Sequence, residues 1–189
     1  MMDEGMQIKG SLTLVLAKPS GEVEVVHKDN IIVNGGFDFV ADAIGNSGSR
    51  PGVMGWIAVG TGTTAAASTQ TALVTEIKRN ASTYAHTAGT KVFTFTASYA
   101  AGDATGALTE AGVFNAASAG TMFDRVVFPV VNKGAILCCP GLGRHARRSN
   151  FSGSSSARAW PSEVLAATTK CCSSLPSAST DTSFRVSCF

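Results

Sequence analysis

The feature that most constrains the fold is a strict alternation of side-chain character in short runs. Between Lys91 and Tyr99 one face of the chain carries Phe93, Phe95, Ala97 and Tyr99, and the other carries Thr94, Thr96 and Ser98. A period of two, with β-branched and aromatic residues, is typical of a half-buried strand. Similar short runs recur over residues 56–131, separated by turns rich in Gly, Ser and Asn. This pattern predicts a mainly β protein, an antiparallel β-sandwich.

The chain before residue 56 predicts a hairpin and one helix. Residues 6–17 alternate with three leucines on one face, and a turn at 18–21 leads to a second strand at 22–27, whose Val23 and Val25 we expect to point inward. A brief apolar run follows at 31–33. Apolar residues then recur at helical spacing, at Phe37, Val40, Ala41 and Ile44. They predict a short helix of about two turns that ends at Gly45, before a polar loop at 46–52.

The central stretch predicts loops at 60–71 and 80–89, where Gly, Thr, Ser and Ala dominate. Residues 73–79 fit a strand or a short helix equally well, because the run is too short for its period to decide. After the strand at 91–99, a turn at 101–106 leads to further strands at 108–114 and 121–131.

The character of the chain changes after Lys133 and Gly134. Residues 1–133 hold nine Lys or Arg and eleven Asp or Glu, whereas residues 134–189 hold six and two. The five cysteines all fall in the second part: Cys138, Cys139, Cys171, Cys172 and Cys188. Two adjacent pairs and a single residue, without a CxxC spacing, fit neither a disulfide framework nor a zinc site.

We therefore expect two parts, a β-sandwich module at 1–134 and an irregular Ser/Arg/Cys-rich tail at 135–189. Trp160 and the run at 164–167 are the only core candidates in the tail. The amino terminus carries Asp3 and Glu4 instead of a basic segment leading into an apolar one, so we expect no secretory signal. No run of about 18 apolar residues exists, which predicts that the chain does not span a membrane.

Residues 60–65, GTGTTA, match the glycine pattern of a dinucleotide-binding loop. That pattern works when a helix follows and brings its amino terminus to a pyrophosphate. Here no convincing helix follows, and the position about 20 residues on, where an acid is needed, is Asn80. We favour a turn between strands and predict no cofactor.

Two carboxylates, Glu76 and Glu110, could in principle act as an acid–base pair. Neither has a third polar group beside it, so an ion pair with Arg79 or Arg125 is the favoured interpretation. The three histidines, His27, His86 and His145, lie far apart, and no GxSxG motif is present. The sequence thus predicts no catalytic, cofactor-binding or metal-ligating residues, and a protein that is not an enzyme.

A small basic cluster lies in the tail, at Arg144, Arg147, Arg148, Arg158 and Lys170. Such clusters can follow a phosphate backbone, but base stacking needs aromatic side chains, and only Phe151 and Trp160 are close in sequence. A solvated tail is favoured over nucleic-acid recognition. Charged residues make up only 15% of the whole chain, against roughly 25% in typical soluble domains. A surface of small methyl and hydroxyl groups costs little to desolvate and suits packing against other proteins.

Four motifs, in this order, resemble those of small structural proteins of tailed bacteriophages. They are IAVGTGTT at 57–64, TALVTEIKR at 71–79, LTEAGVFN at 108–115 and GTMFDR at 120–125. Over about residues 7–133 the chain resembles in particular the N-terminal modules of tail-collar fibre proteins and similar accessory or decoration proteins of the virion. The resemblance implies a non-enzymatic β-sandwich that docks on phage particles, with no catalytic residues to carry over.

The chain departs from this family pattern after Lys133. Such proteins usually close with one more alternating strand, whereas here AILCCPGLGR follows at 135–144. We hypothesise that 136–189 is read in a shifted frame relative to similar proteins, which translation of the other two frames would test. Loss of the closing strand would leave an open sheet edge that favours pairing with a neighbouring chain.

We accordingly expect a structural component of a tailed-phage virion, made in the host bacterial cytoplasm. It would form a homo-oligomer, for example a trimer, and attach to other virion proteins at the tail, collar or baseplate. One alternative is a capsid decoration (cement) protein. Another is a module that binds a glycan of the host surface, for which the candidate aromatics beyond phenylalanine are Trp56, Tyr84, Tyr99 and Trp160.

Overall fold

The computed structural model of the chain describes residues 7–18 and 20–134, and residues 182–188 as main chain. These residues form a helix and a series of strands. In chain order they are β1 (Gly10–Ala17), β2 (Val23–Ile32), α1 (Asn34–Gly45), β3 (Trp56–Gly60), β4 (Glu76–Ala81), β5 (Thr83–His86), β6 (Phe93–Tyr99), β7 (Gly106–Phe114), β8 (Met122–Lys133) and β9 (Thr182–Cys188).

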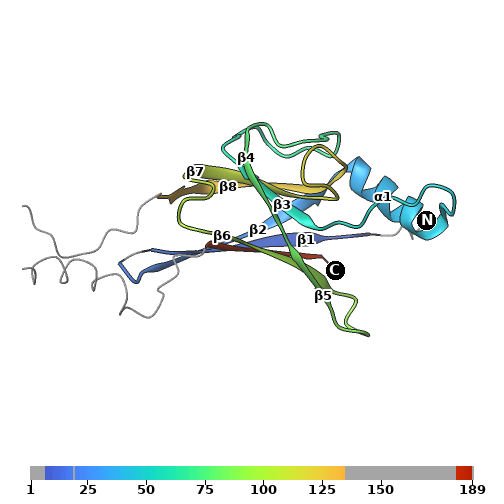
Figure 1. Ribbon diagram of the computed structural model, residues 1–189, viewed down its shortest axis with the longest axis horizontal. Coiled ribbons are helices and arrows are strands. Elements are labelled where there is room, and N and C mark those ends of the chain that lie inside the picture. The colour runs from blue at the N-terminus through green and yellow to red at the C-terminus, as the bar shows by residue number, and fades with distance from the viewer. Residues whose placement is uncertain (1–6, 19, 135–181, 189) are drawn as a thin grey trace, which may run out of the picture. The chain divides into compact units, whose positions relative to one another are not determined.

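The strands form one antiparallel sheet that folds into two facing layers (Figure 1). The order is β4-β3-β7-β8-β2-β1-β9-β6-β5, so that β4, β3, β7 and β8 make one layer and the other five strands make the second. The layers join where β2 pairs with β8, through Ile31 opposite Arg125 and Ile32 opposite Asp124. This architecture confirms the predicted antiparallel sandwich with one short helix.

Apolar side chains from both layers fill the space between them. Leu12, Leu14 and Leu16 of β1 are at most 5% exposed, as their alternation predicts, and so are Phe95, Ala97 and Tyr99 of β6. The facing layer contributes Ile57, Val59, Leu108, Val113, Phe123, Val126 and Phe128. Burial of these side chains is the main source of stability in such a sandwich.

The expected inward orientation of Val23 and Val25 is wrong. They are 57% and 60% exposed, because the β1–β2 hairpin places Glu24 and Val26 opposite Leu16 and Leu14. A shift of one residue in register moves every side chain of a strand to the other face. The turn decides this register, and here it closes with a hydrogen bond from the Lys18 N–H to the Glu22 carbonyl, 2.8 Å long.

Helix α1 ends at Gly45 as predicted but begins earlier, at Asn34, and spans 12 residues. It includes Gly36, which lies against the main-chain carbonyl of Phe123, where a Cβ atom would overlap. This close approach turns Phe39 and Val40 toward the core. Phe37 and Ile44, whose spacing predicted the helix, remain 39% and 75% exposed.

The two edge strands of the sheet come from one continuous stretch of chain. β4 ends at Ala81 and β5 begins at Thr83, while the intervening Ser82 N–H donates to the Gly55 carbonyl at 2.8 Å. Asn80 Nδ2 also donates to the Ser98 carbonyl at 2.8 Å and so ties β4 to β6. The ambiguous run at 73–79 is therefore a strand from residue 76, and the predicted loop at 80–89 is wrong at 80–81 and 83–86.

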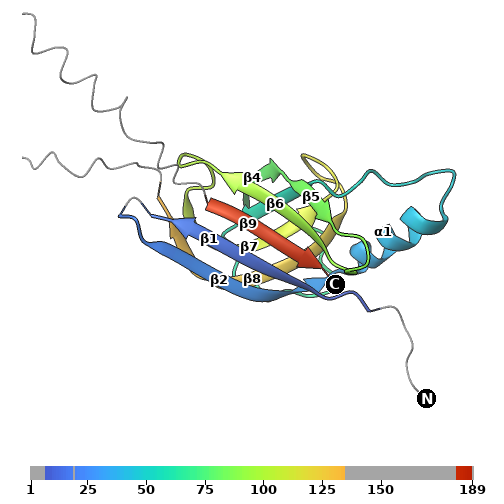
Figure 2. The same ribbon diagram turned by 90° about the horizontal axis from the view of Figure 1, so that it is seen from below.

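The C-terminal strand β9 corrects the expected tail. It lies between β1 and β6 (Figure 2), with Cys188 opposite Gly10 and Phe93 and with Thr182 opposite Leu16 and Tyr99. The irregular-tail prediction is thus wrong for 182–188, and these residues fill the interior of a layer in which we expected an open edge. The rest of the predicted tail, 135–181, with its arginine cluster, Trp160 and four of the cysteines, lies outside the described residues, and the shifted frame stays a hypothesis.

Candidate functional site

The carboxylate of Glu110 is the centre of a buried polar cluster. Arg125 donates to its Oε2 from Nε at 3.0 Å and from Nη2 at 2.7 Å, and both side chains are fully buried. Main-chain N–H groups of the loop between β3 and β4 complete the cluster: Gly62 and Thr75 donate to Oε1 at 3.0 and 2.7 Å, and Val74 donates to Oε2 at 3.1 Å. The sequence interpretation of Glu110 as a partner of Arg125 is confirmed.

These contacts keep Glu110 ionised. Burial alone would raise the pKa of its carboxyl, but the hydrogen bonds from Thr75, Arg125, Val74 and Gly62 outweigh burial and hold the pKa below its usual value. A carboxylate that accepts five bonds has no lone pair directed to a substrate. The cluster therefore acts as a structural clamp between β7, β8 and the loop at 61–75.

The glycines of the GTGTTA motif let the main chain approach Thr75 and Glu110 closely. A Cβ atom on Gly60 would overlap the Thr75 carbonyl, and one on Gly62 would lie 2.5 Å from Glu110 Oε1. The residues after the motif form no helix, and the loop's amide donors are used by a carboxylate of the same chain. The motif thus binds an internal anion where a dinucleotide loop would bind phosphate.

Glu76 and Arg79 form the second expected ion pair, with Nη2 2.7 Å from Oε2. Arg79 also donates to the carbonyls of Ala116 and Ala119 at 2.8 Å, and its guanidinium lies 3.6 Å from the centre of the Phe114 ring. These contacts attach β4 to the β7–β8 turn. They place Glu76 outside the Glu110 cluster, so that the two carboxylates form no acid–base pair.

Asp124 is a buried acid that the sequence analysis did not single out. Its Oδ1 accepts the Val113 N–H at 2.9 Å and its Oδ2 accepts Asn30 Nδ2 at 2.5 Å, at the point where β2 pairs with β8. Burial raises the pKa of Asp124 to about 7, and the two hydrogen bonds counteract only part of the rise. This residue joins the two layers and faces no cleft.

The remaining ionisable residues that were candidates for a site do not lie close together. His27 on β2 contacts Thr13 Oγ1 at 3.1 Å, and His86 on β5 contacts the Val92 carbonyl at 2.7 Å. His145 lies outside the described residues. Within residues 7–18, 20–134 and 182–188, no three His, Cys, Asp or Glu side chains are grouped as metal ligands.

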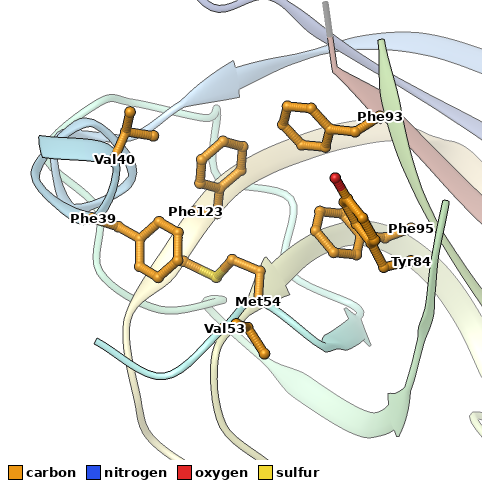
Figure 3. Close-up of a pocket in the computed structure, with 8 residues that line it drawn as sticks. All are labelled: Phe39, Val40, Val53, Met54, Tyr84, Phe93, Phe95 and Phe123. Carbon is orange, nitrogen blue, oxygen red and sulfur yellow. The ribbon is translucent and has the colours of Figure 1, made fainter. Parts of the chain in front are cut away.

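An apolar pocket lies at the α1 end of the sandwich. Its volume is about 400 Å³, and it opens between the two layers where the helix covers β8 (Figure 3). The lining residues are Phe39, Val40, Val53, Met54, Tyr84, Phe93, Phe95 and Phe123. The Tyr84 hydroxyl is the only polar side-chain group among them, so the pocket suits an apolar group.

The rings of the pocket pack against one another and hold it open. Phe123 meets Phe39 and Phe93 edge-on, at centroid distances of 6.4 and 6.3 Å, and Tyr84 lies 5.6 Å from Phe95. Figure 3 shows Phe39 and Val40 entering from the helix on one side, with the rings of β5 and β6 on the other. Such contacts fix ring orientation and leave a preformed cavity.

One side chain of the pocket lining extends far into solvent, because Val53 is 81% exposed. Large exposed apolar side chains beside a concave apolar site are typical of a surface that binds another molecule.

The aromatic residues expected for glycan binding are mostly unavailable to a ligand. Tyr99 is fully buried and donates to the Ile57 carbonyl, and Trp56 packs against a core cluster around Phe114. Tyr84, 58% exposed, does reach the surface, whereas Trp160 lies outside the described residues. Of the pocket residues, Val40, Phe93, Phe95 and Phe123 lie in elements that the sequence predicts and Tyr84 was a candidate aromatic, but Phe39 and Val53 carried no signal beyond their hydrophobicity.

Comparison of the chain with protein-family models, with characterised proteins and with solved structures found no match. No helix in the described part of the chain has the length and apolar character needed to cross a membrane.

Proposed function

We propose that this protein is a non-enzymatic structural component of a tailed-bacteriophage virion. It assembles with copies of itself and attaches to other virion proteins at the tail, collar or baseplate. Its mechanism is burial of apolar and small polar surface, with many weak contacts repeated around the particle.

The positions of the phage-like motifs support this proposal. The motif at 108–115 supplies Glu110, the motif at 120–125 supplies Arg125, and the two glycines come from the motif at 57–64. The residues that carry the resemblance therefore build the central clamp of the sandwich. A resemblance in clamp residues is expected between proteins that share a framework and differ in their surfaces.

The observation that carries the proposal is the aromatic pocket beside α1. A preformed cavity of about 400 Å³, with a single hydroxyl in its lining, offers nothing to orient a polar substrate. It suits an aromatic or branched aliphatic side chain of a neighbouring protein, the kind of anchor that dominates the energy of protein interfaces.

A glycan-binding role has less support. Sugars are recognised by several directed hydrogen bonds together with a stacked ring, because each buried hydroxyl without a partner lowers affinity. The pocket provides the Tyr84 ring with only one hydroxyl. A capsid decoration protein would use the same kind of surface, and the number of copies per particle separates it from a tail or neck component.

The proposal can be tested by rebinding. Particles made without this protein should retain added wild-type protein through sedimentation, whereas the Val53→Glu variant should be lost. Val130→Glu is the matched control, since Val130 is 53% exposed on β8 and lies outside the pocket lining. If neither wild type nor control sediments with particles, or if a host polysaccharide retards the protein in native gels, the proposal is overturned.

A further inference from the structure

The joint between β2 and β8 is the shortest of the strand pairings in the described part of the sheet. β2 pairs with β8 only through Ile31 and Ile32, and one further main-chain bond, from the Val33 N–H to the Phe123 carbonyl at 3.1 Å, extends the joint. By contrast, β2 pairs with β1 along the whole of β1. Side-chain contacts across so short a joint therefore have a large share in holding the two layers together.

A hydrogen-bonded amide and acid cross this joint. Asn30 lies on β2 directly before the paired residues, and its side chain covers Gly10 of β1, where a Cβ atom would overlap the amide. Its Nδ2 reaches Asp124 Oδ2 on β8 at 2.5 Å, and the other oxygen of Asp124 accepts the Val113 N–H at 2.9 Å. The contact thus connects the β1–β2 hairpin to β8 and, through Val113, to β7.

Two neutral donors compensate a buried carboxylate poorly. Glu110, which is as deeply buried as Asp124, accepts five bonds, two of them from the guanidinium of Arg125, whereas Asp124 accepts two. The ionisable side chains of the neighbouring β1, β2 and α1 segments at this end of the sandwich are exposed to solvent: Lys9, His27, Lys28, Asp29, Asp38 and Asp42. No charged side chain bonds to Asp124, so burial favours its neutral form.

The amide of Asn30 has an unused acceptor. Its Oδ1 is buried and has no hydrogen-bond partner. A neutral Asp124 carries an O–H that can donate, and a separation of 2.5 Å lies within the range of O–H···O bonds. A half rotation of the amide exchanges its oxygen and nitrogen, so the same two side chains can bond in either protonation state of the acid.

We propose that Asn30 and Asp124 form a proton-dependent switch that controls how readily the two layers separate at the β2–β8 joint. With a proton on Asp124, its O–H donates to Asn30 Oδ1, and the closed joint contains no buried charge. When the proton passes to solvent, the amide turns Nδ2 toward the carboxylate, and the buried charge weakens the joint. β2 then separates from β8 more easily while the rest of the sandwich stays folded. The switch does not depend on the proposed function.

The direction of the pH dependence follows from the two states of the joint. In the closed joint the pKa of Asp124 is about 7, and when the joint opens and water reaches the acid, the pKa returns toward its ordinary value of 3.8. The closed joint therefore binds the proton more tightly than the open one. The equilibrium constant for opening should rise about 50-fold between pH 5 and pH 7 and level off above pH 8.

The experiment is hydrogen exchange of main-chain amides by NMR in the full-length protein, from pH 5 to pH 8, with each rate corrected for the intrinsic effect of pH on exchange. The reporters are the N–H groups of Val33 and Val113, which bond across the joint and to Asp124 itself. The slowest amides of the protein report global unfolding. We expect the reporters to exchange faster than these amides at pH 8, with little dependence on added urea, because a local opening exposes little surface.

Two variants and one titration complete the test. Asp124→Asn cannot ionise and should remove the 50-fold rise, whereas Asp103→Asn, which changes an exposed acid, should keep it. The carboxyl carbon of Asp124, followed by ¹³C NMR in the wild type, should titrate with a midpoint near pH 7.

Any of three results would overturn the inference. The first is a midpoint for Asp124 near its ordinary pKa, and the second is an Asp124→Asn protein that retains the rise. The third is a wild type in which Val33 and Val113 exchange as slowly as the slowest amides at every pH, because the joint would then open only when the whole sandwich unfolds. The first and third results come from the wild type alone, so they decide the question even if the variant does not fold.

Discussion

Arg125 and Glu110 face each other in the interior of the sandwich, with Nη2 2.7 Å from Oε2 and no exposure of either side chain. The pair connects β7 to β8, and through Gln70, whose Oε1 accepts from Arg125 Nη1 at 2.9 Å, it also holds the loop between β3 and β4. A buried ion pair of this kind is costly to break, because the remaining charge has no solvent to stabilise it.

Replacement of Arg125 by alanine should therefore lower the free energy of unfolding by about 3–5 kcal/mol. The measurement is urea denaturation followed by fluorescence or circular dichroism. Asp103→Ala provides the control, because Asp103 and its partner Lys78 are 36% and 42% exposed and their ion pair should contribute less than about 1 kcal/mol. Equal losses in the two variants would show that the Glu110 cluster is no more important than a surface pair.

Gly62→Ala should destabilise the fold by about 1–3 kcal/mol, because the added Cβ would lie 2.5 Å from Glu110 Oε1 and push the loop away from the clamp. Gly48→Ala and Gly52→Ala are matched controls, since a Cβ at either position meets nothing within 4 Å. Thermal denaturation of the three variants gives the comparison. A Gly62 variant as stable as the controls would mean that the loop does not depend on close approach to the carboxylate.

Asp124 should make stability depend on pH near neutrality. Its pKa in the folded chain is about 7, above the ordinary value of 3.8, so the folded protein binds this proton more tightly than the unfolded chain does. Stability should then fall as pH rises from about 4 to 7, by as much as about 4 kcal/mol. Hydrogen bonds to Val113 and Asn30 limit the fall by favouring the charged form.

The test is the free energy of unfolding of wild type and Asp124→Asn at pH 5 and pH 8. The asparagine keeps an acceptor for the Val113 N–H and cannot ionise. We expect the variant to be the more stable protein at pH 8 and the difference to shrink or reverse at pH 5. Parallel pH profiles of the two proteins would show that Asp124 does not titrate in this range.

Sequence patterns correctly predicted the parts of the fold in which the burial of a residue follows from its position within a single strand. The alternation at 93–99 predicted the burial of Phe95, Ala97 and Tyr99, although Thr94 of the other face is buried as well, and the leucines of β1 did the same for its inner face. The ion pairs of Glu110 and Glu76 were also predictable from the residue types. Full burial of the first pair was not, because it results from the loop at 61–75 folding over it.

Other features depend on contacts between distant residues. The register of the β1–β2 hairpin decides whether Val23 and Val25 point into the core or outward. A shift of one residue reverses their direction and therefore the prediction. Strand β9 pairs with β1 and β6, where Phe184 is opposite Leu14 and Val186 is opposite Phe95, and both partners are far away in sequence. Within β9 itself, Phe184, Val186 and Cys188 alternate with Ser183, Arg185 and Ser187. That short alternation was the signal that the sequence analysis missed.

The aromatic pocket was not predictable from periodicity. It exists because Gly36 lets α1 approach β8 closely enough to place Phe39 against Phe123, while Phe37, two residues earlier, stays outside. Nothing in the helical spacing of apolar residues distinguishes those two phenylalanines.

The most direct test of the account is the absolute quantity of this chain in purified particles, measured by mass spectrometry against labelled peptides. A structural component of the virion should be present at a constant ratio to the major capsid protein after extensive washing, with a low copy number for a tail or neck position and a high one for capsid decoration. A chain that is produced in the infected or induced cell but missing from purified particles would contradict the central claim.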